Sequence, residues 1–174
     1  MIITGGIYKG RKILSPSESI TRPTLSQVRM GVFNTLYSMI GNFEHKNFLD
    51  VFGGSGIMGL EALSRGFENV LIFEKNPKAV QIIKKNYSSL GIEPNLTVGD
   101  SLKLIKKLGR KYDVVYIDPP YNSDFYEEII AGVINNADII IAEHSKPLTV
   151  AGLSPVKLKN FGGKMVSFYS VSAD

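Results

Sequence analysis

Apolar and polar residues recur with two different spacings along most of this chain. Short β-branched and aromatic runs predict strands, and longer segments with apolar residues at helical spacing predict helices between them. The expected strands cover residues 48–52, 70–73, 96–98, 113–117 and 139–142, and the expected helices cover residues 57–65, 77–90, 101–108 and 126–134. Strands that alternate with helices favour an α/β fold with a doubly wound parallel sheet covered on both faces.

The last quarter of the chain departs from that alternation. Residues 155–161 and 164–170 flank Gly162-Gly163. Two apolar runs joined by a glycine pair predict an antiparallel hairpin, which we expect to close the edge of the sheet.

The first 46 residues also depart from it. Residues 2–14 predict a short β-hairpin with a basic rim, and residues 15–24 predict a loop. Apolar residues at helical spacing then predict a helix that Thr24 or Ser26 caps and Gly41 ends. We expect residues 1–46 to be an extension on the core that residues 47–174 form.

Composition narrows the class of protein. A chain of 174 residues is long enough for one domain with a sizeable core. It contains no cysteine, which excludes disulfides and thiolate metal sites. The two histidines, His45 and His144, lie far apart in sequence, so we expect no metal site. The start of the chain lacks the basic and apolar regions of a signal peptide, and we expect a cytoplasmic protein.

The net charge of +4 is concentrated before the first expected core strand. Residues 1–46 hold six basic and two acidic side chains, and the remaining chain is neutral. A basic N-terminal arm suggests a polyanionic partner, although an ordinary solvated surface would have the same charge. The candidate contacts to phosphate are Lys9, Arg11, Lys12, Arg22 and Arg29.

A carboxylate and two prolines follow the expected strand over residues 113–117. Asp118 ends the strand, Pro119 and Pro120 prevent further pairing, and Tyr121 lies at the tip. Ligands of parallel α/β sheets bind outside the carboxyl ends of the strands. A rigid acceptor beside an aromatic ring suits a planar heterocycle with an exocyclic amine. The alternative is a simple turn with a surface tyrosine.

A glycine-rich turn follows the first expected core strand. Gly54, Gly56 and Gly59 form a literal G-x-G-x-x-G, and Glu74 comes eighteen residues after Gly56. This is the spacing of a dinucleotide site, but glycine indicates only a close approach of the backbone to a ligand or a packing partner. NAD, another cofactor and a packing turn without a ligand all remain open at this point.

Acidic residues at successive strand ends favour S-adenosylmethionine over NAD. Asp50 precedes the glycines, where a carboxylate suits the ammonium group of the former and repels the pyrophosphate of the latter. Glu74 can accept both ribose hydroxyls and Asp100 the adenine amine. The candidate cofactor contacts are Asp50, Phe52, Gly53, Gly54, Ser55, Gly56, Glu74, Lys75, Asp100, Ser101 and Asp118.

These motifs resemble the RsmD family, bacterial methyltransferases that act on guanine N2 of 16S ribosomal RNA. The resemblance runs from the N-terminal arm to Tyr121, with mild departures at Gly53 and Tyr121, and with Met30 where an acidic residue is common. The matching residues are Gly5-Gly6, Lys9-Gly10-Arg11-Lys12, Arg22-Pro23-Thr24, Val28-Arg29, Phe33-Asn34, Leu49-Asp50-Val51-Phe52, Gly54-Ser55-Gly56, the run from Gly59 to Gly66, and Asp118-Pro119-Pro120-Tyr121.

The resemblance implies a Rossmann-like class I methyltransferase fold, with a seven-stranded, mostly parallel sheet. It implies S-adenosylmethionine as cofactor, and Asp118, Pro119, Pro120 and Tyr121 as the catalytic motif. The implied partner is 16S ribosomal RNA in a partly assembled small subunit, which a monomer would bind through the basic arm. Arg22 or Thr24 would contact the RNA backbone, the cofactor or the target base. His144 follows the fifth expected strand beside Glu143, and this position alone suggests either a place lining the cleft or a capping or surface role.

Three other functions account for part of the sequence. An adenine-N6 DNA methyltransferase shares the cofactor and the motif, but 174 residues leave little chain for reading a DNA sequence. An NAD-dependent oxidoreductase explains the glycines but not residues 118–121. A non-catalytic RNA-binding domain explains the basic arm but not the acids at the strand ends.

Overall fold

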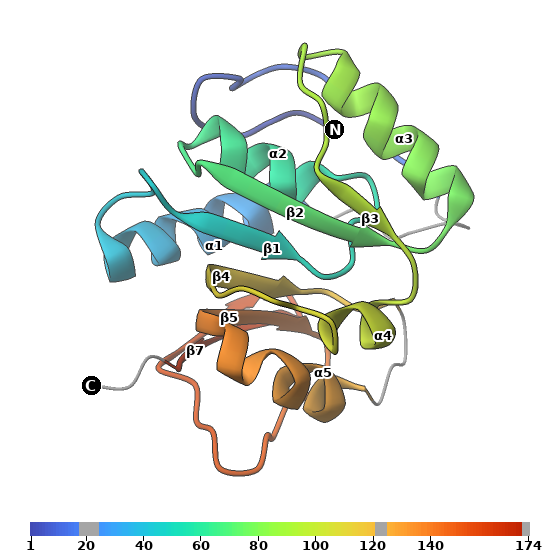
Figure 1. The fold of residues 1–174 in the computed structure, drawn as a ribbon. Coiled ribbons are helices and arrows are strands. Elements are labelled where there is room, and N and C mark those ends of the chain that lie inside the picture. Colours follow the sequence, from blue (N-terminus) through green and yellow to red (C-terminus); the bar gives the residue numbers. More distant parts are fainter. Residues whose placement is uncertain (18–24, 121–124, 172–174) are drawn as a thin grey trace.

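A seven-stranded sheet with the order β3-β2-β1-β4-β5-β7-β6 runs through the molecule (Figure 1). The computed structural model describes residues 1–17, 25–120 and 125–171. The first five strands pair in parallel, whereas β7 is antiparallel to β5 and to β6. The strands are β1 (Asn47–Asp50), β2 (Asn69–Glu74), β3 (Leu96–Val98), β4 (Tyr112–Ile117), β5 (Ala137–His144), β6 (Lys157–Phe161) and β7 (Lys164–Ser170).

Helices cover both faces of the sheet. Helices α1, α2 and α3 pack on one face, and α4 and α5 pack on the other. The helices are α1 (Ser26–Ile40), α2 (Ile57–Ser64), α3 (Pro77–Ser88), α4 (Ser101–Ile105), α5 (Tyr126–Val133) and the short 3-10 helix η1 (Ile134–Asn136). This is the Rossmann-like arrangement with a closing antiparallel hairpin that the sequence predicts, and the prediction is confirmed. No helix in the described ranges is long and apolar enough to cross a membrane.

The expected N-terminal hairpin occurs as a short antiparallel pairing without regular strands. Residues 2–14 form no strands, and one isolated antiparallel bridge joins Ile2 to Lys12. Gly6 has a φ of 78°, and the backbone after it turns towards the end of α2. There Ile7 N donates to the Ser64 carbonyl at 2.8 Å and Tyr8 N to Ser64 Oγ at 2.9 Å. The two arms of the segment also bond to each other, because Ile3 N donates to the Arg11 carbonyl at 3.0 Å and Ile13 N donates to the Met1 carbonyl at 3.0 Å. The segment is therefore paired like a hairpin at its base, and its tip bonds to α2.

The prediction that Ser26 could cap α1 is wrong. Leu25 occupies the N-cap position and makes no capping hydrogen bond through its side chain, while Ser26 is already helical. The Ser26 hydroxyl instead accepts a hydrogen bond from Arg29 at 3.1 Å. Thr24, the other candidate, lies outside the described residues. Gly41 ends the helix with a φ of 79°, as expected.

A buried carboxylate ties the N-terminal segment, α1 and α2 together. Glu61 Oε1 accepts from Thr4 N and Thr4 Oγ1 at 2.9 Å and from Arg29 Nε at 3.1 Å. Glu61 Oε2 pairs with Arg65. Arg29 is 1% exposed and also donates to the Ile2 carbonyl at 2.7 Å, so its predicted role as a phosphate contact is wrong.

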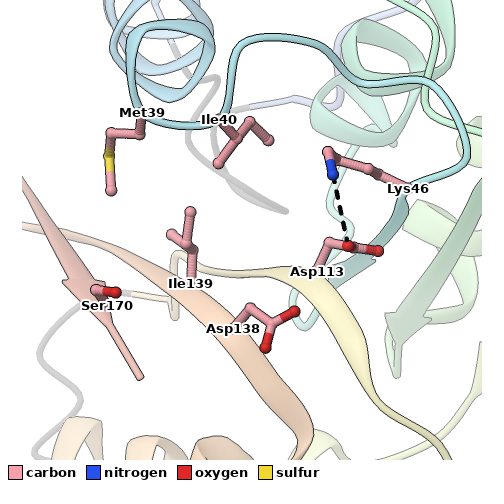
Figure 2. Close-up of a pocket in the computed structure, with 7 residues that line it drawn as sticks. All are labelled: Met39, Ile40, Lys46, Asp113, Asp138, Ile139 and Ser170. Carbon is pink, nitrogen blue, oxygen red and sulfur yellow. Dashed lines mark ion pairs between the residues drawn. The ribbon is translucent and has the colours of Figure 1, made fainter. Parts of the chain in front are cut away.

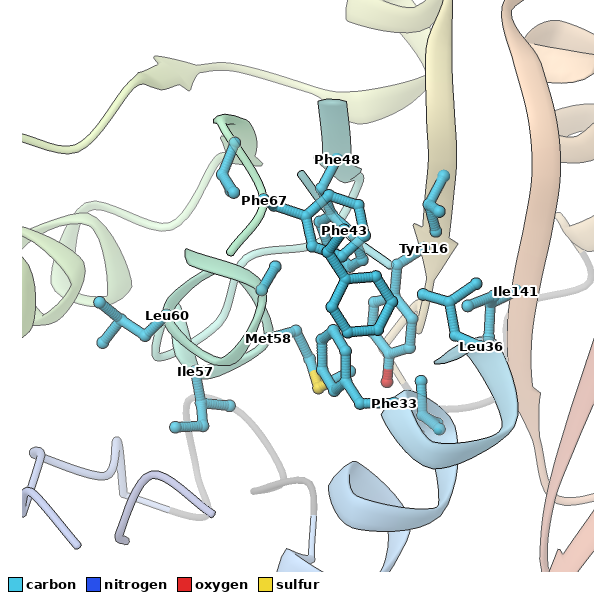
Figure 3. Packing of buried hydrophobic residues seen from close by; sticks show 14 of the residues in the cluster. Phe33, Leu36, Phe43, Phe48, Ile57, Met58, Leu60, Phe67, Tyr116 and Ile141 are labelled. Carbon is cyan, nitrogen blue, oxygen red and sulfur yellow. The ribbon is translucent and has the colours of Figure 1, made fainter. Parts of the chain in front are cut away.

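Aromatic side chains connect α1 to the centre of the sheet. Phe33 of α1 stacks on Phe48 of β1 with ring centroids 6.1 Å apart, and Phe48 stacks on Tyr116 of β4 at 6.2 Å (Figure 3). Aromatic rings bury large apolar surfaces, and Tyr carries a polar group at one end of such a surface. This packing fixes Tyr116 so that its hydroxyl reaches Glu143 at the end of β5.

We expect Glu61→Ala to destabilise the protein strongly. The substitution removes the buried carboxylate that pairs with Arg29 and Arg65 and accepts from Thr4, and breaking a buried ion pair in this way costs about 3–5 kcal/mol. Urea unfolding followed by circular dichroism measures the loss. The matched control is Glu68→Ala, because Glu68 is 57% exposed in its pair with His45 and should contribute less than about 1 kcal/mol. Equal effects of the two substitutions would contradict this role of Glu61.

Candidate active site

Acidic side chains from four neighbouring strands meet at the carboxyl edge of the sheet. Asp50 ends β1, Glu74 ends β2, Asp118 follows β4 and Glu143 lies next to the end of β5. Because these strands are parallel neighbours, their carboxyl ends lie at one edge. The sequence predicts the first three at this edge, and the structure brings them together there with Glu143.

The glycine turn between β1 and α2 has the close backbone geometry that its sequence predicts. Gly54 and Gly56 have φ angles of 58° and 79°, a region that favours glycine. Gly59 has a different reason to be glycine, because a Cβ there would lie 2.4 Å from the Tyr87 hydroxyl. The third glycine of the G-x-G-x-x-G therefore serves packing of α2 against α3 and does not identify a dinucleotide.

Glu74 lies directly beside this turn. Its carboxylate accepts from Gly54 N at 2.8 Å and from the backbone N–H groups of Lys75 and Asn76 at 2.9 and 2.8 Å. Three backbone donors hold the carboxylate in one orientation at the rim of the turn. Lys75, the next residue along the chain, is exposed.

The other candidate cofactor contacts lie along the same edge. Ser101 is buried and donates to the Val51 carbonyl at 2.6 Å, which ties α4 to the end of β1. Asp100 is half-buried and caps α4 by accepting from Lys103 N at 3.2 Å. Ser55 Oγ accepts from Ile57 N at 3.3 Å at the start of α2. Phe52 is half-buried, and Gly53 is buried.

Asp50 is the most buried acid among the candidate cofactor contacts. It is 1% exposed and accepts a hydrogen bond from Phe52 N at 3.3 Å. Burial raises the pKa of Asp50 well above its usual value, and the negative charges of Asp118, Glu74 and Glu143 raise this pKa further. A cationic ligand next to Asp50 would relieve both effects.

Asp118 shares a lysine with Glu143. Lys164 Nζ lies 3.4 Å from Asp118 Oδ1 and 3.1 Å from Glu143 Oε2. Tyr116 donates its hydroxyl to Glu143 Oε1. Burial and the nearby Asp118 charge raise the pKa of Glu143 to about 8, against the opposing effects of Lys164 and Tyr116. Pro119 is buried after this cluster and Pro120 is exposed.

Sequence reasoning missed Glu143, Lys164 and Tyr116 as members of this cluster. Glu143 was visible as an acid beside the fifth expected strand. Lys164 opens the second strand of the expected hairpin, and an antiparallel strand in that position begins at the carboxyl edge. The antiparallel pairing of the hairpin with β5 would have placed Lys164 at the site. The sequence does not show which strand the hairpin pairs with.

His144 belongs to the structural framework. Its Nδ1 lies 2.7 Å from the Lys146 carbonyl oxygen, and its Nε2 lies 2.8 Å from Ser167 Oγ. Burial lowers the pKa of His144 below its usual value. Both ring nitrogens are engaged by neighbouring protein groups, which favours the capping role over a place in the cleft. No group of three acidic or histidine side chains suited to a metal ion occurs in the described part of the chain.

The candidate phosphate contacts are only partly brought together. Lys9, Arg11 and Lys12 are exposed in the N-terminal segment, and Arg11 donates to the Ser89 carbonyl at 3.3 Å. Arg29 is buried, as described above. The candidates Arg22, Thr24 and Tyr121 lie outside the described residues.

A hollow of about 350 Å³ lies at the amino ends of the central strands, on the side of the sheet away from their carboxyl ends (Figure 2). Asp113 and Asp138 line it near the amino ends of β4 and β5, with Met39 and Ile40 from the end of α1. Asp113 pairs with Lys46 at 4.0 Å and accepts from Asn47 N at 2.7 Å. The glycine turn and Asp118 lie at the other ends of their strands, so this hollow is separate from the candidate active site.

Comparisons with known proteins agree on one family. The model of the family described as conserved hypothetical protein 95 matches residues 1–170. The "Ribosomal RNA small subunit methyltransferase D" of Escherichia coli strain K12 is 33% identical over 129 residues, covering 74% of this chain and 64% of that protein. The protein of the same name from Buchnera aphidicola subsp. Acyrthosiphon pisum is 38% identical over 132 residues, covering 74% of this chain and 66% of that protein.

A solved structure extends the similarity over the whole chain. The "Putative methyltransferase yhhF" from Escherichia coli has a TM-score of 0.83 at 28% identity, and the match covers 100% of this chain and 99% of that chain. This chain therefore shares the fold of that protein over its whole length. The chain belongs to the conserved hypothetical protein 95 family, which is the RsmD family of methyltransferases that its sequence resembles.

Proposed function

We propose that this enzyme transfers a methyl group from S-adenosylmethionine to the exocyclic N2 amine of a guanine in 16S ribosomal RNA. The observation that carries the proposal is the position of Asp118-Pro119-Pro120 at the same edge as the glycine turn and Asp50. The names of the two small-subunit methyltransferases support ribosomal RNA as the substrate class.

The residues at the edge fit a cationic cofactor. S-adenosylmethionine supplies a reactive methyl group on a sulfonium and carries an ammonium group. Asp50 is buried with a raised pKa, so a nearby positive charge would stabilise its ionised form. Glu74, oriented by three backbone donors, would accept from the ribose hydroxyls, and Gly54 and Gly56 would let the ligand approach the backbone. Phe52, Gly53, Ser55, Lys75, Asp100 and Ser101 would complete the site.

Asp118 and the motif after it would handle the substrate amine. The lone pair of an aromatic amine is delocalised into the ring, which makes the nitrogen a poor nucleophile. Asp118 and the Pro119 carbonyl would accept hydrogen bonds from both amine hydrogens and direct the lone pair towards the methyl group, so that positioning and electrostatics carry the catalysis. As the nitrogen bonds the methyl carbon and the carbon–sulfur bond breaks, Asp118 would take the proton that the amine loses. Tyr121 would stack on the base, a contact worth about 1–3 kcal/mol. The guanine must be unpaired or turned out of its helix to enter.

The exposed basic residues of the N-terminal segment would bind the RNA backbone. Lys9, Arg11 and Lys12 are exposed there, and we propose that Arg22 and Thr24 also contribute to RNA binding. The substrate would be a partly assembled small subunit, chosen by its shape, and the enzyme a cytoplasmic monomer. The buried acids at the strand ends weigh against an NAD-dependent oxidoreductase, since they would repel a pyrophosphate.

Asp118→Asn is expected to lower the rate of methyl transfer by about 10²–10⁴-fold, the usual contribution of a positioned proton-transfer group. Single-turnover transfer of tritium from labelled cofactor to unmodified small subunits measures this rate. The control is Asp113→Asn on the same strand, because Asp113 lies at the opposite edge beside Lys46. The control should retain nearly the full rate. An Asp118→Asn enzyme with an unchanged rate would assign this carboxylate a purely structural role.

The methylated product tests the choice of substrate. Labelled methyl groups should enter assembled small subunits faster than naked 16S RNA, and nucleoside mapping should yield N2-methylguanosine. N6-methyladenine in duplex DNA would establish the rival DNA methyltransferase instead. NADH is the control ligand for cofactor binding. Calorimetric titration with NADH should show no binding heat at concentrations where S-adenosylmethionine binds.

The double substitution Arg11→Ala with Lys12→Ala is expected to weaken RNA binding and its dependence on salt. For single-stranded RNA, removing one cation that neutralises a phosphate should reduce the slope of log affinity against log salt by about 0.7. Filter binding at several salt concentrations measures both quantities. Lys107→Ala is the control, because Lys107 is exposed beyond α4 on the other face of the sheet. An unchanged slope in the double variant would remove the N-terminal segment from the RNA interface.

A further inference from the structure

Lys164 reaches the candidate active site because of the direction of its strand. Strand β7 runs antiparallel to β5, with Glu143 opposite Val166 and His144 opposite Met165. Its first residue therefore lies at the carboxyl edge, where the parallel strands end. The Lys164 ammonium lies between Asp118 Oδ1 at 3.4 Å and Glu143 Oε2 at 3.1 Å.

The environment of this lysine differs from that of a surface ion pair. The side chains of Lys164 and Asp118 are 24% and 21% exposed, and that of Glu143 is completely buried. Charges interact more strongly at such a site than in open solvent. Burial lowers the pKa of the Lys164 ammonium, but the two carboxylates outweigh this effect and raise it overall, which keeps the lysine charged.

We propose that Lys164 is a positioning residue for methyl transfer, which keeps the Asp118 carboxylate ionised and directed into the site. The inference rests on the proposed function, in which Asp118 must accept hydrogen bonds from the amine. A protonated Asp118 would lose part of that acceptor capacity. Lys164 provides the opposite charge that favours the ionised form, and Glu143 with Tyr116 holds Lys164 in place.

The charges around Asp118 make the effect of removing Lys164 predictable in sign. The acids Glu143 of β5 and Asp50 of β1 face Asp118, both with raised pKa values, and the hydroxyls of Tyr116 on β4 and Tyr126 on α5 interact with it electrostatically. Without the ammonium, the ionised form of Asp118 loses its nearby opposite charge and becomes harder to form. Removing Lys164 therefore raises the pKa of Asp118. The pKa of Glu143, about 8, keeps this acid largely protonated where Asp118 titrates, so Glu143 affects the Asp118 midpoint little.

The experiment measures the titration of Asp118 directly and through activity. Carboxyl ¹³C NMR of protein labelled at aspartate, with the Asp118 signal assigned by its disappearance in Asp118→Asn, gives the titration midpoint without any substrate. We expect Lys164→Met to raise this midpoint by about 1–3 pH units, the usual effect of an adjacent opposite charge. The acid limb of the kcat profile should move up by a similar amount, while the KM for S-adenosylmethionine changes little.

Three further variants make the outcome decisive. Glu143→Gln should leave the Asp118 midpoint nearly unchanged, because Glu143 is largely protonated in that pH range. Lys164→Arg should retain most of the wild-type profile, and the double variant Lys164→Met with Glu143→Gln should titrate like Lys164→Met. If Lys164→Met fails to fold, Lys164→Gln removes the same charge from a polar side chain and should raise the Asp118 midpoint in the same way. The control is Lys159→Met, an exposed lysine on the neighbouring strand β6, which should leave the midpoint and kcat unchanged.

Different results would overturn the role of Lys164 and the proposed methyl transfer. An unchanged Asp118 midpoint in Lys164→Met, or a uniform loss of rate with an unchanged pH profile, would overturn the role of Lys164. A wild-type enzyme that transfers no methyl group to guanine N2 would overturn the proposed function, and the NMR midpoints would still report on the ion pair.

Discussion

The crowding of desolvated carboxylates at one edge of the sheet is the constraint on which the site depends. Parallel strands bring Asp50, Asp118 and Glu143 to the same edge, and the fold buries two of them almost completely. Burying a charge is costly unless it is paired and hydrogen-bonded. Each acid has a partner that partly stabilises its charge: a backbone donor for Asp50, a tyrosine hydroxyl for Glu143 and the Lys164 ammonium for Asp118. The pKa values of Asp50 and Glu143 are nevertheless raised, so these partners do not fully offset burial and the repulsion between the acids.

This incomplete neutralisation distinguishes between cofactors that the glycine turn does not separate. A ligand with a sulfonium and an ammonium would reduce the repulsion among the acids, whereas a pyrophosphate would increase it. The structure also explains the third glycine of the G-x-G-x-x-G by its packing against Tyr87. The resemblance of the turn to a dinucleotide motif therefore carries less weight than the charge of the side chains around it, in agreement with the family to which the chain belongs.

The sequence predicted the parts of the fold that depend on local patterns. Runs such as residues 113–117 are apolar enough to identify buried strands, and their acidic ends follow from the sequence itself. Long-range partners were beyond its reach. Arg29 looked like a surface cation because its partner Glu61 lies 32 residues away. The pairing of the first residues as a hairpin could be predicted, but the hydrogen bonds from its tip to Ser64 of α2 could not. Lys164 and Glu143 could not be joined to Asp118 without the register of β7 against β5.

That register connects the topology of the sheet to its chemistry. A parallel strand beside β5 would begin at the opposite edge, where Asp113 and Asp138 lie, and its first residues would be far from Asp118. Only an antiparallel neighbour begins at the carboxyl edge, and it can be connected by a short loop at that edge to the antiparallel strand beyond it. Gly162 and Gly163 form that connection, and Lys164 follows them directly. The closing hairpin distinguishes this sheet from a fully parallel one, and its strand β7 places the Lys164 ammonium next to Asp118.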